Sequence, residues 1–393
     1  KQELPINGQI RAKEVQLISD TGEKLGMVPL ARALELAGET TEESISVLFT
    51  GTLYMTDSFK KSYKAFLDRK TGDSYYREMV ARLTEKSFYS ANHGLGDVKK
   101  LLEYLGSPEK ELKVFHVAGT NGKGSTCKML HTIIRELGFS CGLFTSPYIR
   151  IFNERIQVNE ENISNTMLTA LTNRVLQVQK EIGIDLNQFA LVTVIALLYY
   201  RLKGVDYVVL ETGLGGEFDP TNIISKPVCT VITNIGLDHV GVLGDSIEKI
   251  AAAKAGIIKS CVPIVCYPVE KPALEVIKNK CNELNAPLLV VNKQDVKINN
   301  TSVSGTDFSF ASENYHVAMN GDFQAYNACV AISAIETVFG KSAHITAKIK
   351  SGLTKMFWPG RLELISKEPL CFMDGGHNPQ CIKTVTAFLD KYY

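Results

Sequence analysis

A glycine-rich turn between a predicted strand and a predicted helix constrains the fold of this chain more than any other feature. The run over residues 114–118 reads Val-Phe-His-Val-Ala and predicts a buried strand, while residues 127–137 place leucine and isoleucine side chains on one helical face. Gly138 can end this helix. Glycines let backbone N–H groups approach phosphate oxygens, and the start of a helix adds partial positive charge. The segment therefore predicts a binding site for ATP or a related nucleotide.

The turn departs from the common phosphate-binding pattern G-x-x-x-x-G-K-[ST]. Val117 stands where that pattern has its first glycine, and Gly124 separates Lys123 from the serine. A tight strand-to-helix turn without a ligand is the alternative, but Lys123 is well placed to neutralise the β- and γ-phosphates. Lys123 is therefore also a predicted catalytic residue. The predicted nucleotide-binding residues of the turn are Gly119, Thr120, Asn121, Gly122, Lys123, Gly124 and Ser125.

The bulk properties of the chain narrow its partners and its compartment. With 393 residues it is long enough for two or three domains, and its net charge of +1 argues against a nucleic acid as the partner of the whole chain. The longest apolar stretch, over residues 189–200, is too short to span a membrane, and the N-terminus lacks a signal-peptide core. Cysteines are scattered without a C-x-x-C pair, which favours reduced thiols. We expect a cytoplasmic protein with no membrane contact.

From about residue 75 onward, apolar strand candidates alternate with helix candidates. Such alternation predicts an α/β fold in which helices flank a parallel sheet. Polar residues at the carboxyl ends of parallel strands converge on one crevice, where such sheets bind their ligands. The predicted strands cover residues 114–118, 141–145, 205–210, 229–233, 264–267 and 288–291.

Three side chains at the ends of predicted strands form a candidate Mg²⁺ site. Ser146, Glu211 and His239 each follow a strand candidate. A hydroxyl, a carboxylate and an imidazole could complete a Mg²⁺ shell together with phosphate oxygens and water. Taken singly, a strand-end serine or a lone histidine is more often structural, but behind a phosphate-binding turn the three together indicate metal ligands.

The phrase over residues 116–126, His-Val-Ala-Gly-Thr-Asn-Gly-Lys-Gly-Ser-Thr, resembles the phosphate loop of folylpolyglutamate synthase and dihydrofolate synthase, which belong to the Mur ligase superfamily. The resemblance runs from about residue 75 to the end of the chain, with further motifs in the family's order. It implies a Mur-ligase-like ATP-binding P-loop domain over residues 75–358 and a Rossmann-like C-terminal domain. Because family members continue further, residues 359–393 are expected to be a truncated form of that domain.

The resemblance implies an ATP-dependent carbon–nitrogen ligase that uses ATP and Mg²⁺. The carboxylate of a folate or of dihydropteroate would receive the γ-phosphoryl group of ATP, and L-glutamate would then displace phosphate from the acyl phosphate. The small-molecule partners are therefore expected to be ATP, L-glutamate and a folate or dihydropteroate, and the protein is expected to be a monomer. A Mur-type amide ligase acting on another carboxylate remains an alternative.

The resemblance also assigns metal-binding roles. Ser146, Glu211 and His239 match the family's metal ligands. Lys254, in the phrase Lys-Ala-Gly-Ile, matches a catalytic lysine that is carbamylated and helps to hold a second metal. The residue before that lysine is usually acidic but here is Ala253, and a solvated helix lysine is the alternative for Lys254.

Five further residues match the family's nucleotide site. Gln324 and Asn327 open a predicted helix and match nucleotide contacts, with ordinary polar residues of a helix start as the alternative. Arg361 follows Trp-Pro-Gly, and its guanidinium would bind the nucleotide and stabilise the transferring γ-phosphoryl group as a catalytic residue. Asp374 and His377, in Asp-Gly-Gly-His-Asn, resemble the nucleotide-binding and catalytic contribution of the C-terminal domain.

The resemblance places the binding site for the acceptor at two segments. Residues 150–156 resemble the family's loop beside the pterin and glutamate sites, and Phe152 could stack on an aromatic ring. A second segment departs from the family by placing Glu217 where arginine is usual. The predicted substrate residues are Arg150, Phe152, Arg155 and Asp219.

Residues 1–40 resemble a different family, the N-terminal domain of bacterial translation initiation factor 3. Two strands, over residues 6–18 and 25–28, and a helix over residues 29–37 carry this resemblance. A fused fragment is the favoured interpretation, and a ribosome-binding module joined to an inactive ligase remnant is the alternative. Residues 41–74 are expected to be a linker with a basic amphipathic helix, for which a nucleic-acid patch is the less favoured alternative.

Overall fold

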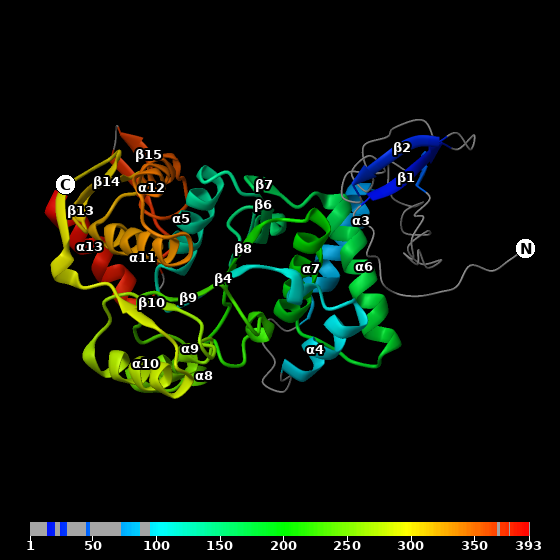
Figure 1. Ribbon diagram of the computed structural model, residues 1–393, viewed down its shortest axis with the longest axis horizontal. Helices are drawn as coiled ribbons and strands as arrows, with labels where there is room; N and C mark the ends of the chain where they lie inside the picture. Colours follow the sequence, from blue (N-terminus) through cyan, green and yellow to red (C-terminus); the bar gives the residue numbers. More distant parts are fainter. Residues whose placement is uncertain are drawn as a thin grey trace, which may run out of the picture. The chain divides into compact units, whose positions relative to one another are not determined.

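The computed structural model describes residues 14–19, 24–29, 45–47, 72–86, 95–367, 370–376 and 378–392 (Figure 1). The chain divides into two compact units. Unit 1 consists of Lys1–Leu112 and Asn162–Gly204, and unit 2 consists of Lys113–Glu161 and Val205–Tyr393. The stretch expected as one domain over residues 75–358 is thus shared between the two units.

Unit 1 contains a small antiparallel sheet formed by the N-terminal segment. β1 (Glu14–Ser19) pairs with β2 (Lys24–Pro29), which confirms the second predicted strand and the last part of the first, whose residues 6–13 lie outside the described residues. β1 also pairs with β3 (Ile45–Val47), a strand that falls in the expected linker and was not predicted. The helix predicted over residues 29–37, apart from Pro29, and the basic segment of the expected linker lie outside the described residues.

The other described residues of unit 1 form mainly helices. Two of these helices begin at a side-chain cap: the Ser164 side chain accepts a hydrogen bond from the Met167 N–H, and the Asn187 side chain accepts one from the Ala190 N–H. None of the helices in the described part of the chain combines the length and apolarity needed to cross a membrane. The helices are α3 (Gly72–Thr84), α4 (Leu95–Tyr104), α6 (Asn165–Glu181) and α7 (Gln188–Lys203), with a 3-10 turn at Pro108–Glu111.

Unit 2 is built on an eight-stranded sheet with the order β11-β10-β9-β4-β8-β5-β6-β7. All six predicted strands are present and pair in parallel, which confirms the α/β fold. β6 runs antiparallel to β5, and neither β6 nor β7 was predicted because both are very short. The strands are β4 (Val114–Ala118), β5 (Cys141–Phe144), β6 (Ile156–Val158), β7 (Glu161–Asn162), β8 (Tyr207–Glu211), β9 (Cys229–Ile232), β10 (Ile264–Cys266) and β11 (Leu288–Val290).

Helices cover both faces of this sheet because its strands carry apolar side chains on both sides. Val231 and Val265 join a core with α5 (Lys123–Glu136), α11 (Asp322–Phe339) and α12 (Ala343–Lys355), which lie together in Figure 1. Ile232 and Ile264 face the other way, toward α9 (Ile247–Ala255) and α10 (Lys271–Leu284). The carboxyl end of β4 therefore lies between two packed layers, which fixes the start of the phosphate loop.

Two smaller sheets and a last helix complete unit 2. β12 (Val296–Ser302), β13 (Gly305–Phe310) and β14 (Glu313–Val317) form an antiparallel sheet, and β15 (Glu363–Lys367) pairs with β16 (Leu370–Met373). α13 (Pro379–Tyr392) is anchored at its end, where the Tyr392 hydroxyl donates to Asp322 at 2.7 Å. A 3-10 turn at Lys293–Asp295 precedes β12.

Candidate active site

The phosphate loop joins β4 to α5, as the sequence predicts. Gly122 is the N-cap of α5 and has a φ of 85°, a left-handed conformation that favours glycine. A Cβ at this position would lie 2.6 Å from Asn327 Oδ1, so a larger residue would collide with α11. The first backbone N–H groups of a helix lack partners within the helix, so the start of α5 can bind an anion.

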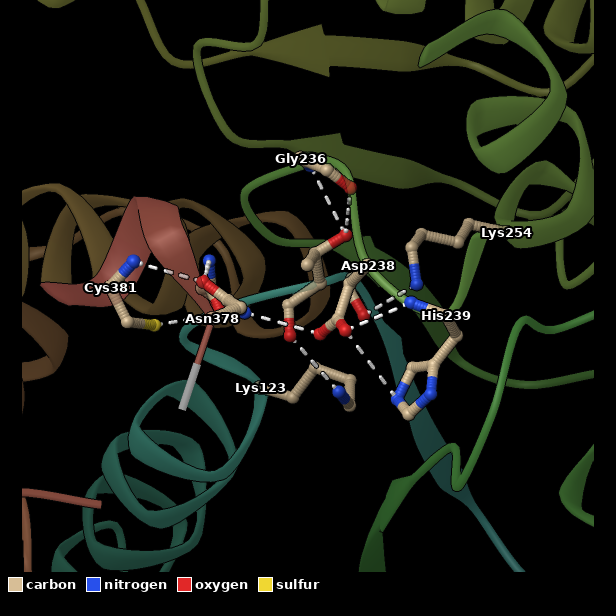
Figure 2. Close-up of polar contacts among 10 residues, drawn as sticks. Lys123, Gly236, Asp238, His239, Lys254, Asn378 and Cys381 are labelled. Carbon is tan, nitrogen blue, oxygen red and sulfur yellow. Dashed lines mark hydrogen bonds and ion pairs between the residues drawn. The ribbon is translucent and has the colours of Figure 1, made fainter. Parts of the chain in front are cut away.

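Hydrogen bonds to the segment after β9 hold this loop in place. The Thr120 N–H donates to the Asn234 carbonyl at 2.7 Å, and the Thr233 hydroxyl donates to the Asn121 carbonyl at 2.9 Å. The Thr120 hydroxyl lies 3.1 Å from both the N–H and the carbonyl of Gly236 (Figure 2). Since these contacts need no ligand, the loop is preorganised for binding.

A pocket of about 170 Å³ opens beside the loop, and its walls all belong to unit 2. Many residues predicted from the sequence line it together: Thr120, Asn121, Gly122, Lys123, Gly124, Ser125, Ser146, Glu211, Gln324, Asn327, Arg361 and Asp374. Others that line it were not predicted: Asn234, Tyr267, Phe323, Gln380, Cys381, Thr384 and Val385. Sequence motifs with fixed spacing could not identify these residues, because they come from four separate segments and are residue types that are common in any protein.

Glu211 ends β8 at the wall of the pocket. It is 3% exposed, and its Oε2 accepts a hydrogen bond from the Ser146 N–H at 3.1 Å. Burial raises the pKa of Glu211, while the positive charges of Lys123 and Arg361 lower it. Glu211 also lines the pocket, so this buried carboxylate suits a hard cation.

The described residues contain no cluster of three His, Cys, Asp or Glu side chains that would bind a metal without help. A Mg²⁺ ion held by Glu211 and Ser146 would therefore need oxygens from phosphate and water. Mg²⁺ is commonly bound in this way, by one or two carboxylates plus substrate phosphates. The donor set thus fits the ion only when a nucleotide is present.

Lys254 on α9 is buried, at 4% exposed, so the alternative of a solvated helix lysine is wrong. Its Nζ donates to the Gly119 carbonyl at 2.7 Å. Burial, with a smaller contribution from Lys123, lowers the pKa of Lys254 to about 7, and Asp238 acts in the opposite direction. A lysine with this pKa is partly neutral near pH 7, which is what carbamylation requires.

His239 lies at a more open edge of the site. Its side chain is 49% exposed, and its Nε2 lies 3.9 Å from Asp238 Oδ1. It has a φ of 50° as the N-cap of α8 (Val240–Leu243). Figure 2 shows the side chains of Lys123, Lys254 and His239 around Asp238. His239 does not line the pocket, unlike the predicted metal ligands Ser146 and Glu211.

The start of α13 contacts the phosphate loop through side-chain amides. Asn378 Nδ2 donates to Asn121 Oδ1 at 2.9 Å and to Asp238 Oδ2 at 3.1 Å (Figure 2). Asn121 Nδ2 donates to Gln380 Oε1 at 2.9 Å. The predicted catalytic residue His377 lies outside the described residues, so its role stays a prediction.

The other predicted nucleotide residues are held mainly by one another and by backbone. Asn327 Nδ2 donates to Gln324 Oε1 at 3.0 Å, which orients two buried amides at the pocket wall. Asp374 accepts from the N–H groups of Leu362 at 2.9 Å and Gly376 at 2.7 Å. Asp374 thereby braces the loop that presents Arg361 to the pocket.

The predicted acceptor residues do not line the pocket. Arg150 is exposed, whereas Phe152 is 3% exposed and its ring lies 5.7 Å from that of Tyr148. The Arg155 guanidinium lies over both rings, at 5.2 Å from Tyr148 and 5.4 Å from Phe152. The stacking surface of Phe152 is thus already used inside the protein.

Asp219 is buried in its own loop. Its Oδ2 accepts from the N–H groups of Gly213 and Leu214, both at 2.9 Å. Its Oδ1 accepts from the N–H of Thr221 at 3.0 Å and from the Thr221 hydroxyl at 2.5 Å. Burial raises the pKa of Asp219, and these donors lower it. The contacts favour a role in holding the loop over direct contact with a substrate.

Comparisons with known proteins identify the family of this chain. The Mur ligase middle domain matches residues 117–335, and the N-terminal domain of translation initiation factor IF-3 matches residues 6–42. The chain is 41% identical to the dihydrofolate synthase/folylpolyglutamate synthase of Bacillus subtilis, over 78% of this chain and 74% of that protein. It is 34% identical to the folylpolyglutamate synthase of Lacticaseibacillus casei, over 75% of this chain and 71% of that one.

Solved structures extend the similarity to the fold. A folylpolyglutamate synthase bound to the ATP analogue AMPPCP and folate matches with a TM-score of 0.74 and 31% identity, over 80% of each chain. The Mycobacterium tuberculosis folylpolyglutamate synthase complexed with ADP matches with a TM-score of 0.74 and 26% identity, over 82% of this chain and 75% of that chain.

The fold and the site define an ATP-dependent ligase of the Mur ligase superfamily. Within it, this chain belongs to the folylpolyglutamate synthase and dihydrofolate synthase family, carbon–nitrogen ligases that use ATP and Mg²⁺ to add L-glutamate to a folate. The match to the initiation factor domain confirms the second resemblance, that of the N-terminal segment.

Proposed function

We propose that this chain adds L-glutamate to dihydropteroate and also to reduced folates, through an acyl phosphate formed in the pocket beside the phosphate loop. The observation that carries the proposal is the convergence of Lys123, Arg361 and the buried Glu211 on one pocket. The similarity to a Bacillus subtilis protein that carries both synthase names supports the use of both acceptors.

The chemistry explains why such a pocket is needed. A carboxylate is a poor electrophile, so an oxygen of the acceptor carboxylate first attacks the γ-phosphorus of ATP and ADP leaves. The α-amine of L-glutamate then attacks the carbonyl carbon of the acyl phosphate. The carbon–oxygen bond to phosphate breaks, the amine loses a proton, and an amide and inorganic phosphate result.

The protein contributes positive charge where negative charge develops. Lys123 and Arg361 would stabilise the oxygens of the transferring phosphoryl group, and the N–H groups at the start of α5 would bind the adjoining phosphates. Mg²⁺, when bound through Glu211 and Ser146, neutralises further phosphate charge. Carbamylated Lys254 would add an anionic oxygen ligand beside the loop, and His239 would complete the site from its open edge.

The experiment measures phosphate release by the purified full chain with ATP, Mg²⁺ and L-glutamate. Dihydropteroate, tetrahydrofolate or a simple carboxylate outside the folate class is added in turn. Glutamate-dependent release with both pterin acceptors supports the proposal. Release with only one of them restricts the acceptor to that one, and release with the simple carboxylate alone favours a Mur-type ligase of another specificity.

A further inference from the structure

A buried chain of hydrogen bonds joins the strand before the phosphate loop to the turn after Glu211. His116, in the middle of β4, lies with its Nε2 2.8 Å from the Thr221 hydroxyl. The Thr221 hydroxyl lies in turn 2.5 Å from Asp219 Oδ1. His116 and Thr221 are 0% exposed, and Asp219 is 3% exposed. None of the three lines the nucleotide pocket, so this series of hydrogen bonds is separate from the ligand-binding residues described above.

The direction of the hydrogen bonds follows from the chemistry of each group. Both carboxylate oxygens of Asp219 already accept backbone N–H groups, so Asp219 acts as an acceptor throughout. The single hydroxyl hydrogen of Thr221 therefore points to Asp219. The Thr221 oxygen must then accept from His116, whose proton lies on Nε2. Burial lowers the pKa of His116 to about 3, so the ring is neutral and this arrangement persists across the working pH range.

At the other end of this series of hydrogen bonds, Asp219 fixes the turn that follows Glu211. Asp219 Oδ2 receives the N–H groups of Gly213 and Leu214, which follow Glu211 by two and three positions. The same turn is seated on the end of α9, because the Glu217 N–H donates to the Ala253 carbonyl at 2.9 Å. A Cβ on Gly216 would lie 2.8 Å from the Lys254 carbonyl, so the turn packs too closely against α9 to admit a larger side chain there.

We propose that His116 and Thr221 are positioning residues that hold Asp219, and that Asp219 in turn holds the turn over residues 212–216. This turn keeps Glu211 and Lys254 in place at the proposed Mg²⁺ site. The inference rests on the magnesium role proposed above for Glu211. It assigns Asp219 to the support of the site instead of to the acceptor.

The test compares Thr221→Val, which keeps the shape of the side chain but removes the hydroxyl, with Thr221→Ser, which keeps the hydroxyl. Thr230→Val is the matched control. Thr230 lies opposite His116 on β9, is also 0% exposed, and its hydroxyl has no hydrogen-bond partner among the described residues. All variants are titrated with Mg²⁺ in the phosphate-release assay.

Thr221→Val should raise the Mg²⁺ concentration for half-maximal activity by about tenfold to a hundredfold, as changes behind metal ligands usually do. Thr221→Ser and Thr230→Val should stay close to the parent. A second readout needs no turnover: Trp358 is the only tryptophan, and its ring packs beside Gly124 in the first turn of α5. Its fluorescence should show the same Mg²⁺ shift with AMPPCP, and unchanged binding of AMPPCP without metal.

Glu211→Gln separates the possible failures. If Glu211→Gln leaves the Mg²⁺ requirement unchanged, the proposed magnesium role itself is wrong. If Glu211→Gln raises the requirement but Thr221→Val does not, only the positioning inference is wrong. Should Thr221→Val fail to fold, Thr221→Ala removes the hydroxyl without adding volume and is titrated in its place. If neither folds while Thr221→Ser does, the hydroxyl serves folding and the inference is also overturned.

Discussion

The two sides of the proposed metal site are built differently. On one side, Glu211 and Lys254 are 3% and 4% exposed, and hydrogen bonds to backbone hold both. On the other side, the His239 side chain is 49% exposed, and its Nε2 lies 3.9 Å from Asp238 Oδ1. Burial shifts the pKa of Glu211 upward and that of Lys254 downward, so protein packing tunes the first side. The comparison teaches that the buried side sets the geometry, while water can substitute on the exposed side.

Lys123 lines the pocket together with Glu211 and would stabilise the transferring phosphoryl group, so its removal gives the largest expected effect. Lys123→Ala should lower ATP turnover by about a hundredfold to a thousandfold, the usual loss when a preorganised group that stabilises transition-state charge is removed. The fold should persist, because the side chain points into the pocket and supports no core. Steady-state phosphate release measures the effect, with Lys249→Ala on the exposed face of α9 as the control. Parent-like turnover would rule out the phosphate-loop interpretation.

The two sides can be compared directly with one substitution on each. Glu211→Gln should raise the Mg²⁺ requirement by more than about a hundredfold, since it removes the buried charge that a cation needs. His239→Gln should raise it by about tenfold or less, because water can take the place of a half-exposed imidazole at small cost. Mg²⁺ titrations of both variants measure the difference. Equal effects would contradict the distinction between a buried and an exposed side.

Lys254 gives the buried side a pH dependence. Its pKa of about 7 means that the amine is neutral above that pH and can bind carbon dioxide, and is protonated and unable to do so below it. Activity should therefore fall by about tenfold per unit as the pH drops below about 7. Added bicarbonate should oppose the fall, and short carboxylic acids should partly restore Lys254→Ala. No effect of bicarbonate at any pH would argue against carbamylation.

The sequence predicted the sheet well because each strand of its parallel core is a short and mostly apolar run, as from Val114 to Ala118. The sequence also identified the loop over residues 120–125 that lines the pocket, since one short turn contains all of these residues. It could not predict that Asp219 faces four donors of its own loop, or that Asn378 and Gln380 reach Asn121. The contacts of Asn378 and Gln380 join segments far apart in sequence, and those of Asp219 lie in an irregular loop without hydrophobic periodicity.

The N-terminal segment provides the smallest expected effect. No residue that lines the pocket precedes Thr120, and β1, β2 and β3 all belong to unit 1. Deletion of residues 1–71 should leave the affinity for AMPPCP within about twofold of the parent, the range expected for changes away from a site. Trp358 fluorescence gives the affinity, and circular dichroism checks the fold. A folded truncated chain that no longer binds AMPPCP would show that the segment supports the ligase.

The most direct test of the central claim follows an oxygen atom. The acceptor is prepared with a heavy oxygen isotope in its reacting carboxylate and is incubated with the protein, ATP, Mg²⁺ and L-glutamate. If the pocket activates the carboxylate as an acyl phosphate, one labelled oxygen moves into each inorganic phosphate that is released. Mass spectrometry of the phosphate should therefore show the label in step with amide formation. Amide formation with unlabelled phosphate would contradict the account.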